Sequence, residues 1–336
     1  MQKKGLLLIS GLDSILAGKL LAEGGVLLEI VYFHIPFCTC LNKDSECKMK
    51  LKLEQITAEV FGSLLHVIGV GEEYLPVLKY PEYGYGKNMN PCIDCKIFMF
   101  KKAKEYMQEF DAAYLITGEV LGERPMSQNR KALDLIEEKA ELSGLVLRPL
   151  SAKLMPLTYP EKEGWVERDK LLDIQGRSRK VQLNLAKEYN IRDYPAPAGG
   201  CLLTDPGFSR RLKDLMKYKP DFSLRDISLL KLGRHFRISD SLKLIVGRNE
   251  DENNKLEKLF NPDSDALLMP VNTPGPSVLA IGKGFEDNML RLSGIAASYC
   301  KLNGMAEVEI EFIFKSGKSI LKTKSRDRNV FENLKI

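Results

Sequence analysis

The sequence predicts an α/β protein in two parts, a doubly wound parallel sheet followed by a second, smaller α+β domain. Up to residue 192, short apolar runs alternate with stretches of helical periodicity, which is typical of parallel strands joined by helices. A segment rich in Pro and Gly over residues 193–200 interrupts this pattern, and the elements after it change in order. A chain of 336 residues with 44% hydrophobic residues is long enough for two cores.

The first part is expected to alternate strands and helices, each identified by its apolar pattern. The expected strands are residues 5–9, 25–33, 66–70, 113–117 and 145–148. The expected helices are residues 14–22, 51–65, 93–110, 127–141 and 180–189. Because the carboxyl ends of parallel strands meet at one edge of the sheet, ligands are expected to bind there.

The boundary between the two parts is placed after Thr204, because the Pro- and Gly-rich segment cannot continue a helix. The expected domains are therefore residues 1–204 and residues 205–336. In the second domain, the expected helices are residues 208–218, 224–231 and 287–300, and the expected strands are residues 242–246, 278–281 and 307–314.

The first strand runs directly into small residues and then into a helix. These residues are Ile9, Ser10, Gly11, Leu12, Asp13 and Ser14. In an α/β fold, such a turn presents the unpaired amides of a helix N-terminus to an anion. Asp13 suits a phosphate site only if it binds a cation or caps the helix. The pattern favours a nucleotide with Mg²⁺, and an ordinary capped strand–turn–helix is the alternative.

Seven cysteines, an odd number, favour a reducing compartment rather than a disulfide framework. Cys92 and Cys95 lie three residues apart at the expected start of a helix, so both can face one ligand. Lys96 and the positive helix end are expected to favour thiolates. The spacing alone allows a redox pair, half a zinc site or part of an iron–sulfur site. Cys201, beside two glycines, is free to join the pair.

Three segments carry a resemblance to a known superfamily. Residues 9–14 resemble the Ser-Gly-Gly-x-Asp-Ser loop of the PP-loop ATP pyrophosphatases, with Ile9 and Ser10 replacing its first two residues. Residues 115–128 and 147–150 are similar to segments of tRNA 4-thiouridine synthetases. The layout of the three cysteines is similar to that of tRNA 2-thiouridylase-like enzymes that modify tRNA.

This resemblance implies an adenine nucleotide alpha hydrolase-like fold and ATP-dependent thiolation of a tRNA uridine, whose carbonyl oxygen is adenylated and then replaced by sulfur. It further implies a 4Fe-4S cluster on Cys92, Cys95 and Cys201, which with Asp13 are the expected catalytic residues. The sulfur source would be sulfide or a sulfur-donor protein. The residues expected to bind Mg-ATP or the adenylate are Ser10, Gly11, Asp13, Ser14, His34, Thr117 and Gly118.

Basic residues concentrate in the second domain, although the net charge of the chain is only +5. Residues 209–248 carry eleven Lys or Arg against four Asp or Glu, and residues 315–328 carry six against one. Such a surface favours nucleic acid as a partner, with a merely solvated face as the alternative. Residues 229–237 and 246–250 resemble the small RNA-associated domain of NFACT proteins, which implies RNA binding and tRNA as the partner.

Other interpretations remain open at this point. A cluster-free enzyme could use Cys95 and Cys201 as persulfide carrier and resolving thiol, or the protein could be a non-catalytic RNA-binding adaptor on a decayed loop. A small-molecule sulfurtransferase is a further alternative. Cys38, Cys40 and Cys47 are expected in a mobile loop rather than in a second metal site. The N-terminal apolar run is too short for a membrane span, so a cytoplasmic protein is expected, and a homodimer is left open.

Overall fold

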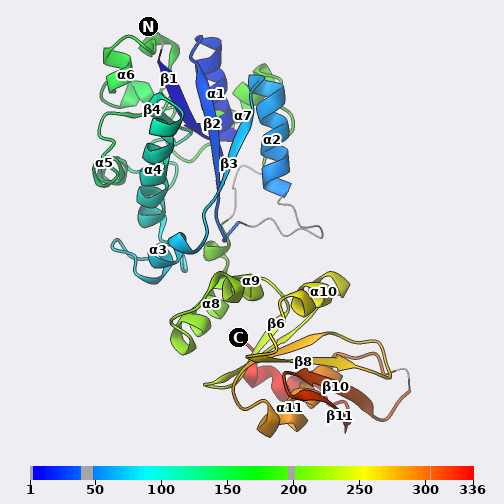
Figure 1. Cartoon of the computed structure of the whole chain (residues 1–336). Helices are drawn as coiled ribbons and strands as arrows, with labels where there is room; N and C mark the ends of the chain where they lie inside the picture. The colour runs from blue at the N-terminus through cyan, green and yellow to red at the C-terminus, as the bar shows by residue number, and fades with distance from the viewer. Residues whose placement is uncertain (1–2, 39–47, 196–200, 303) are drawn as a thin grey trace. The chain divides into compact units, whose positions relative to one another are not determined.

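In the computed structural model, the residues described are 3–38, 48–195, 201–302 and 304–336. The chain divides into two compact units, Met1–Thr204 and Asp205–Ile336. Each unit is built around a sheet of its own (Figure 1). Among the residues described, no helix has both the length and the apolar character that a membrane crossing requires.

The first unit is a five-stranded parallel sheet flanked by helices, as predicted. Its strands are β1 (Lys4–Leu8), β2 (Leu28–His34), β3 (Leu65–Gly69), β4 (Ala112–Thr117) and β5 (Val146–Leu147). Its α-helices are α1 (Leu12–Glu23), α2 (Lys48–Phe61), α3 (Leu75–Lys79), α4 (Cys92–Glu109), α5 (Arg130–Lys139), α6 (Tyr159–Lys162) and α7 (Lys180–Glu188). The strand order is β3-β2-β1-β4-β5. The chain first adds β2 and β3 on one side of β1 and then β4 and β5 on the other side, so a topological switch point lies between β1 and β4.

Helices cover both faces of this sheet. α1 packs against α2 and α7, whereas α4 packs against α5 (Figure 1). Two helices end or begin away from their expected positions, for local reasons. α2 ends at Phe61 because Gly62 adopts a left-handed φ of 61°. α5 begins at Arg130 because the side chain of Asn129 caps it, accepting a hydrogen bond from the amide of Ala132 at 3.0 Å.

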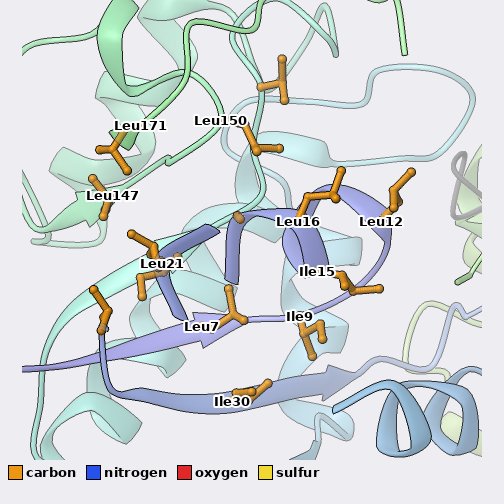
Figure 2. Packing of buried hydrophobic residues seen from close by; sticks show 14 of the residues in the cluster. Leu7, Ile9, Leu12, Ile15, Leu16, Leu21, Ile30, Leu147, Leu150 and Leu171 are labelled. Carbon is orange, nitrogen blue, oxygen red and sulfur yellow. The ribbon is translucent and has the colours of Figure 1, made fainter. Parts of the chain in front are cut away.

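The core of the first unit fixes the turn between β1 and α1. Figure 2 shows Leu7 and Ile9 on the strand side packed against Ile15 and Leu16 of α1, with Ile30 of β2 below them. Each of these side chains is at least 98% buried. Burying such a side chain stabilises the fold by about 1.5–3 kcal/mol, so residues 10–14 are held between two well-anchored elements.

The second unit is a six-stranded antiparallel sheet with helices, in agreement with the predicted α+β class. Its strands are β6 (Arg234–Ser239), β7 (Leu242–Val246), β8 (Asp265–Pro270), β9 (Val278–Gly282), β10 (Val308–Phe314) and β11 (Gly317–Thr323). Its α-helices are α8 (Pro206–Tyr218), α9 (Leu224–Leu230), α10 (Glu250–Lys258) and α11 (Met289–Ala297). The sheet order is β11-β10-β8-β9-β7-β6.

Four of these elements were absent from the prediction, namely β6, β8, β11 and α10. The reason is clearest for α10, which is charged almost throughout and buries only Glu252 and Leu256, so it lacks an apolar stripe. β11 is an exposed strand whose lysines hide its alternation. Lys318 and Lys322 on β11 pair across the hairpin with Glu311 and Glu309 of β10, at 3.2 and 3.0 Å.

Candidate active site

The loop between β1 and α1 gathers backbone amides around one side chain. The amides of Ser10 and Gly11 donate hydrogen bonds to Ser14 Oγ at 2.8 and 3.1 Å. Ser14 Oγ in turn donates to the carbonyl of Gly11 at 2.7 Å, and Ser14 is buried. The free amides and the positive dipole end of α1 add to these donors, so the loop carries the groups that bind an anion.

The end of β4 meets this loop through a glycine. β1 and β4 pair as far as Leu8 and Thr117, so Gly118 follows directly beside the loop. A Cβ on Gly118 would lie less than 3.0 Å from the backbone nitrogen of Ser14 and from the backbone carbon of Asp13. Only a residue without a side chain permits this approach of two backbones.

A cavity of about 280 Å³ opens at the switch point between β1 and β4. It is the kind of place where α/β proteins bind ligands. Its lining includes Ser10, Gly11, Asp13, Ser14, Thr117 and Gly118. Cys95, Cys201, Lys96 and Arg124 line the same cavity. The structure thus brings most of the predicted nucleotide site and two of the three predicted cysteines to one place.

Asp13 is held by an arginine from far along the chain. Arg179 Nη1 lies 3.0 Å from Asp13 Oδ2, and Arg179 also pairs with Glu123. Burial raises the pKa of Asp13 above its ordinary value although Arg179 opposes the shift, and burial together with the charge of Asp13 raises the pKa of Glu123. Among the described residues, Asp13 Oδ1 and Glu123 Oε2 are buried without a hydrogen-bond partner. Two such carboxylate oxygens suit Mg²⁺.

The three predicted cysteines are free thiols that gather around Tyr74. Each of Cys95, Cys201 and Cys92 contributes to a raised pKa of Tyr74, although burial of its hydroxyl is the main cause. Burial also raises the pKa of Cys92 and Cys95, and raises that of Cys201 to about 12. The expectation that Lys96 and the helix end would favour thiolates is therefore wrong, because burial outweighs both.

A short backbone bridge to the residues that follow β2 holds Cys201 at the cavity. The amide of Leu202 donates to the carbonyl of Phe37 at 3.0 Å, and Cys38 and Cys201 are bridge partners. Cys38 also lines the cavity, a position that was not predicted. The predicted loop cysteines Cys40 and Cys47 lie outside the described residues, as do the glycines at 199 and 200.

A buried set of charges at the end of β4 was missed in the sequence. Lys96 Nζ lies 3.2 Å from Glu119 Oε1, and Arg148 Nε lies 3.0 Å from Glu119 Oε2. Arg148 also pairs with Glu137. Burial alone would raise the pKa of Glu119, but the charges of Lys96 and Arg148 hold it below its ordinary value. One signal in the sequence was a carboxylate placed two residues after an apolar strand.

The three free cysteines are donors of the kind that an iron–sulfur cluster takes. Within the described ranges, no three His, Cys, Asp or Glu side chains are close enough to hold one metal ion. In a 4Fe-4S cluster each thiolate binds a different iron, so the sulfurs need not converge on one point. Three free thiols around one tyrosine are compatible with that donor set.

His34 is the predicted nucleotide residue that the cavity does not include. It is the last residue of β2, and its carbonyl accepts a hydrogen bond from the amide of Val70 at 2.9 Å. Its neighbours Phe33 and Ile35 line the cavity, whereas His34 is not among the described residues that do so. Contact between His34 and an adenine stays a prediction.

The basic surface of the second unit is partly neutralised within the unit. Arg237 and Lys243 share Asp214, and the β11 lysines pair with β10 as described above. In contrast, Arg210 and Lys213 of α8 form no ion pair with any described residue. These two residues are therefore the best candidates on α8 for contacts with an anionic partner.

Comparison with known proteins gives two family matches. Residues 1–153 match the family described as thiamine biosynthesis protein (ThiI), and residues 233–332 match the NFACT protein RNA binding domain. The first match includes residues 10–14, Cys92, Cys95 and Thr117, and it ends before Cys201. Both resemblances noted in the sequence are confirmed by these matches.

Similarity to individual proteins is partial. A probable tRNA sulfurtransferase of Lysinibacillus sphaericus (strain C3-41) is 33% identical over 167 residues, which are 49% of this chain and 39% of that protein. A crystal structure of a 4-thiouridine synthetase–RNA complex with bound ATP has a TM-score of 0.38 at 23% identity, covering 68% of this chain and 52% of that chain. The C-terminal part of the fibronectin/fibrinogen-binding protein of Streptococcus suis has a TM-score of 0.27 at 13% identity, covering 73% and 89%.

The two family matches fall in different units of the structure. The ThiI match ends within the first unit, and the NFACT match lies wholly within the second. The chain is therefore similar to the ThiI family over residues 1–153 and to the NFACT protein RNA binding domain over residues 233–332, and it spans less than half the length of the tRNA sulfurtransferase that it matches.

Proposed function

We propose that this protein is an ATP-dependent tRNA sulfurtransferase, a tRNA thiouridine synthase. The observation that carries the proposal is one cavity lined both by the anion-binding loop at residues 10–14 and by Cys95 and Cys201. A reaction that activates a carbonyl with ATP and then replaces its oxygen with sulfur needs both sites around one substrate atom. The match to the ThiI family supports the same assignment.

In the first step, a uridine carbonyl oxygen attacks the α-phosphorus of ATP, pyrophosphate leaves, and a ring nitrogen of the base loses its proton. The amides of Ser10 and Gly11 bind phosphate oxygens in place of Ser14 Oγ. Asp13 and Glu123 would hold Mg²⁺, which neutralises phosphate charge when bound. Gly118 lets the end of β4 approach the loop that binds the phosphates.

In the second step, hydrosulfide forms a bond to the activated carbon, the carbon–oxygen bond breaks, and AMP leaves with the electron pair. The proton of the hydrosulfide ends on the ring nitrogen that lost one in the first step. Cys92, Cys95 and Cys201 would hold a 4Fe-4S cluster, which supplies iron-bound sulfide when present. A cluster-free persulfide route would use only Cys95 and Cys201 and would leave the free thiol of Cys92 without a role.

Anaerobic purification of the wild type is expected to give about four iron and four acid-labile sulfide per chain, and Cys92→Ala is expected to lose them. Both proteins would then be assayed for ATP-dependent thiouridine in tRNA by mass spectrometry. Cys300→Ala is the matched control, since Cys300 packs on the core of the second unit. Thiouridine formed by a wild type free of iron would overturn the cluster, and no thiouridine from an iron-replete wild type would overturn the function.

We assign ATP and sulfur chemistry to residues 1–204 and tRNA binding to residues 205–336. Replacing both Arg210 and Lys213 by Gln is expected to weaken the binding of tRNAs of different sequence to the same extent. The slope of the logarithm of the binding constant against the logarithm of the salt concentration should fall in magnitude by about two. Lys322→Gln is the control, because Glu309 already neutralises that lysine. Filter binding at several salt concentrations measures the slope; an unchanged slope would remove α8 from the RNA surface.

A further inference from the structure

The charges around Glu119 form a chain with a buried centre and one end at the cavity. Glu119 and Arg148 in the centre are each 2% exposed, and Glu137, whose side chain is 13% exposed, ends the chain beyond Arg148. Lys96 forms the end at the cavity, with its side chain 34% exposed. Burying an ionised carboxylate is costly unless cations compensate it, so this arrangement fixes the positions of its members closely.

Within this chain of charges, Lys96 is the cation that lines the cavity. It follows Cys95 in α4 and lines the same cavity as Ser10, Gly11 and Cys201. Its ammonium has three donors, and Glu119 can accept only part of them. The remaining donors are available to a ligand in the cavity.

Arg124 is the other cation on the cavity wall. Its charge opposes the rise in the pKa of Asp13 and Glu123, and it acts on Cys92 and Cys201 as well. Lys96 is distinguished by its position, because the buried Glu119 carboxylate holds its ammonium at 3.2 Å on the wall that Cys95 also lines.

We propose that Lys96 binds the phosphate of AMP as the leaving group of the sulfur-transfer step, and that Glu119 is the positioning residue that holds it there. This inference rests on the proposed function. When the carbon–oxygen bond breaks, the electron pair passes to the phosphate oxygen, and its negative charge grows. A fixed ammonium beside the thiols meets that charge without having to reorganise.

The test measures affinities for AMP and for adenosine, which lacks the phosphate, by titration calorimetry. Lys96→Gln is expected to weaken AMP binding by about tenfold or more, as for loss of a charged hydrogen bond, and to leave adenosine binding within about twofold. Lys96→Arg is expected to restore most of the preference for AMP. Lys104→Gln, which removes a surface partner of Glu141 farther along α4, is the control and should bind both as the wild type does.

The outcomes separate this inference from the proposed function. Equal weakening of AMP and adenosine by Lys96→Gln, or no weakening of AMP, overturns the phosphate contact even if the wild type thiolates tRNA. A preference for AMP that depends on Lys96, in a wild type that forms no thiouridine, upholds the contact and overturns the function. In an active enzyme, Lys96→Gln should slow thiouridine formation more than pyrophosphate release.

Discussion

Gly118→Ala is expected to reduce ATP-dependent pyrophosphate release by at least about 100-fold, the scale of a misplaced reacting group. The new methyl group would lie less than 3.0 Å from backbone atoms of Ser14 and Asp13, and neither can move aside as a flexible side chain does. The loop must shift as a whole, and its amides then lose their positions at the phosphate. The free energy of unfolding should also fall by about 1–3 kcal/mol, the usual cost of overpacking.

Gly69→Ala is the matched control for this substitution. Gly69 is the last residue of β3 in the same parallel sheet, a place similar to that of Gly118 just after β4, but nothing lies within 4 Å of the position that its Cβ would occupy. Its pyrophosphate release and stability should stay close to wild type. If Gly118→Ala retained full activity, the approach of β4 to the loop would have no role in nucleotide binding.

Arg148→Met is expected to lower the free energy of unfolding by about 3–5 kcal/mol, because it breaks a fully buried ion pair and leaves the Glu119 carboxylate with only part of its compensating charge. Glu119 would keep only Lys96, and Glu137 would keep no ion-pair partner among the described residues. Arg130→Met is the control, since its exposed pair with Asp134 is worth at most about 1 kcal/mol. Chemical denaturation of the three proteins at pH 7 gives the comparison.

The pH dependence of the same variants has a definite sign. In the wild type the native pKa of Glu119 lies below its unfolded value of about 4.3, so its contribution to stability is present above that pH and is lost as the pH falls through the native pKa. In Arg148→Met, one of the two cations that oppose the effect of burial is gone, so the pKa of Glu119 rises. The loss of unfolding free energy relative to the wild type should therefore be smaller at pH 5 than at pH 7, and an equal loss at both pH values would contradict the ionic explanation.

Elements with continuous apolar runs were predictable from the sequence, and so was the place where they put a ligand. The run at residues 113–117 became β4 (Ala112–Thr117), and the small residues after β1 became the loop at the switch point. Parallel strands are buried on both faces, so their composition alone identifies them. Strands with one polar face, such as β11, were missed for the opposite reason.

The partnerships between charged residues were not predictable. Arg179 meets Asp13, and Lys96 meets Glu119, only after the chain has folded. The local pattern of apolar and polar residues predicts neither the distance between two such residues nor their burial. A charged residue is most often exposed. The thiol prediction failed for the same reason, because helix end and lysine were visible in the sequence while the burial that outweighs them was not.

Any ligand that binds the amides of the loop must displace the hydroxyl of Ser14 from them. Since two amides already donate to this oxygen, an arriving molecule gains only the difference between its own acceptor and a neutral hydroxyl. A sugar or an alcohol would replace one neutral hydroxyl acceptor by another and would gain almost no binding free energy. A phosphate brings full negative charge to the same donors, so the resting loop discriminates against neutral molecules before any other residue touches them.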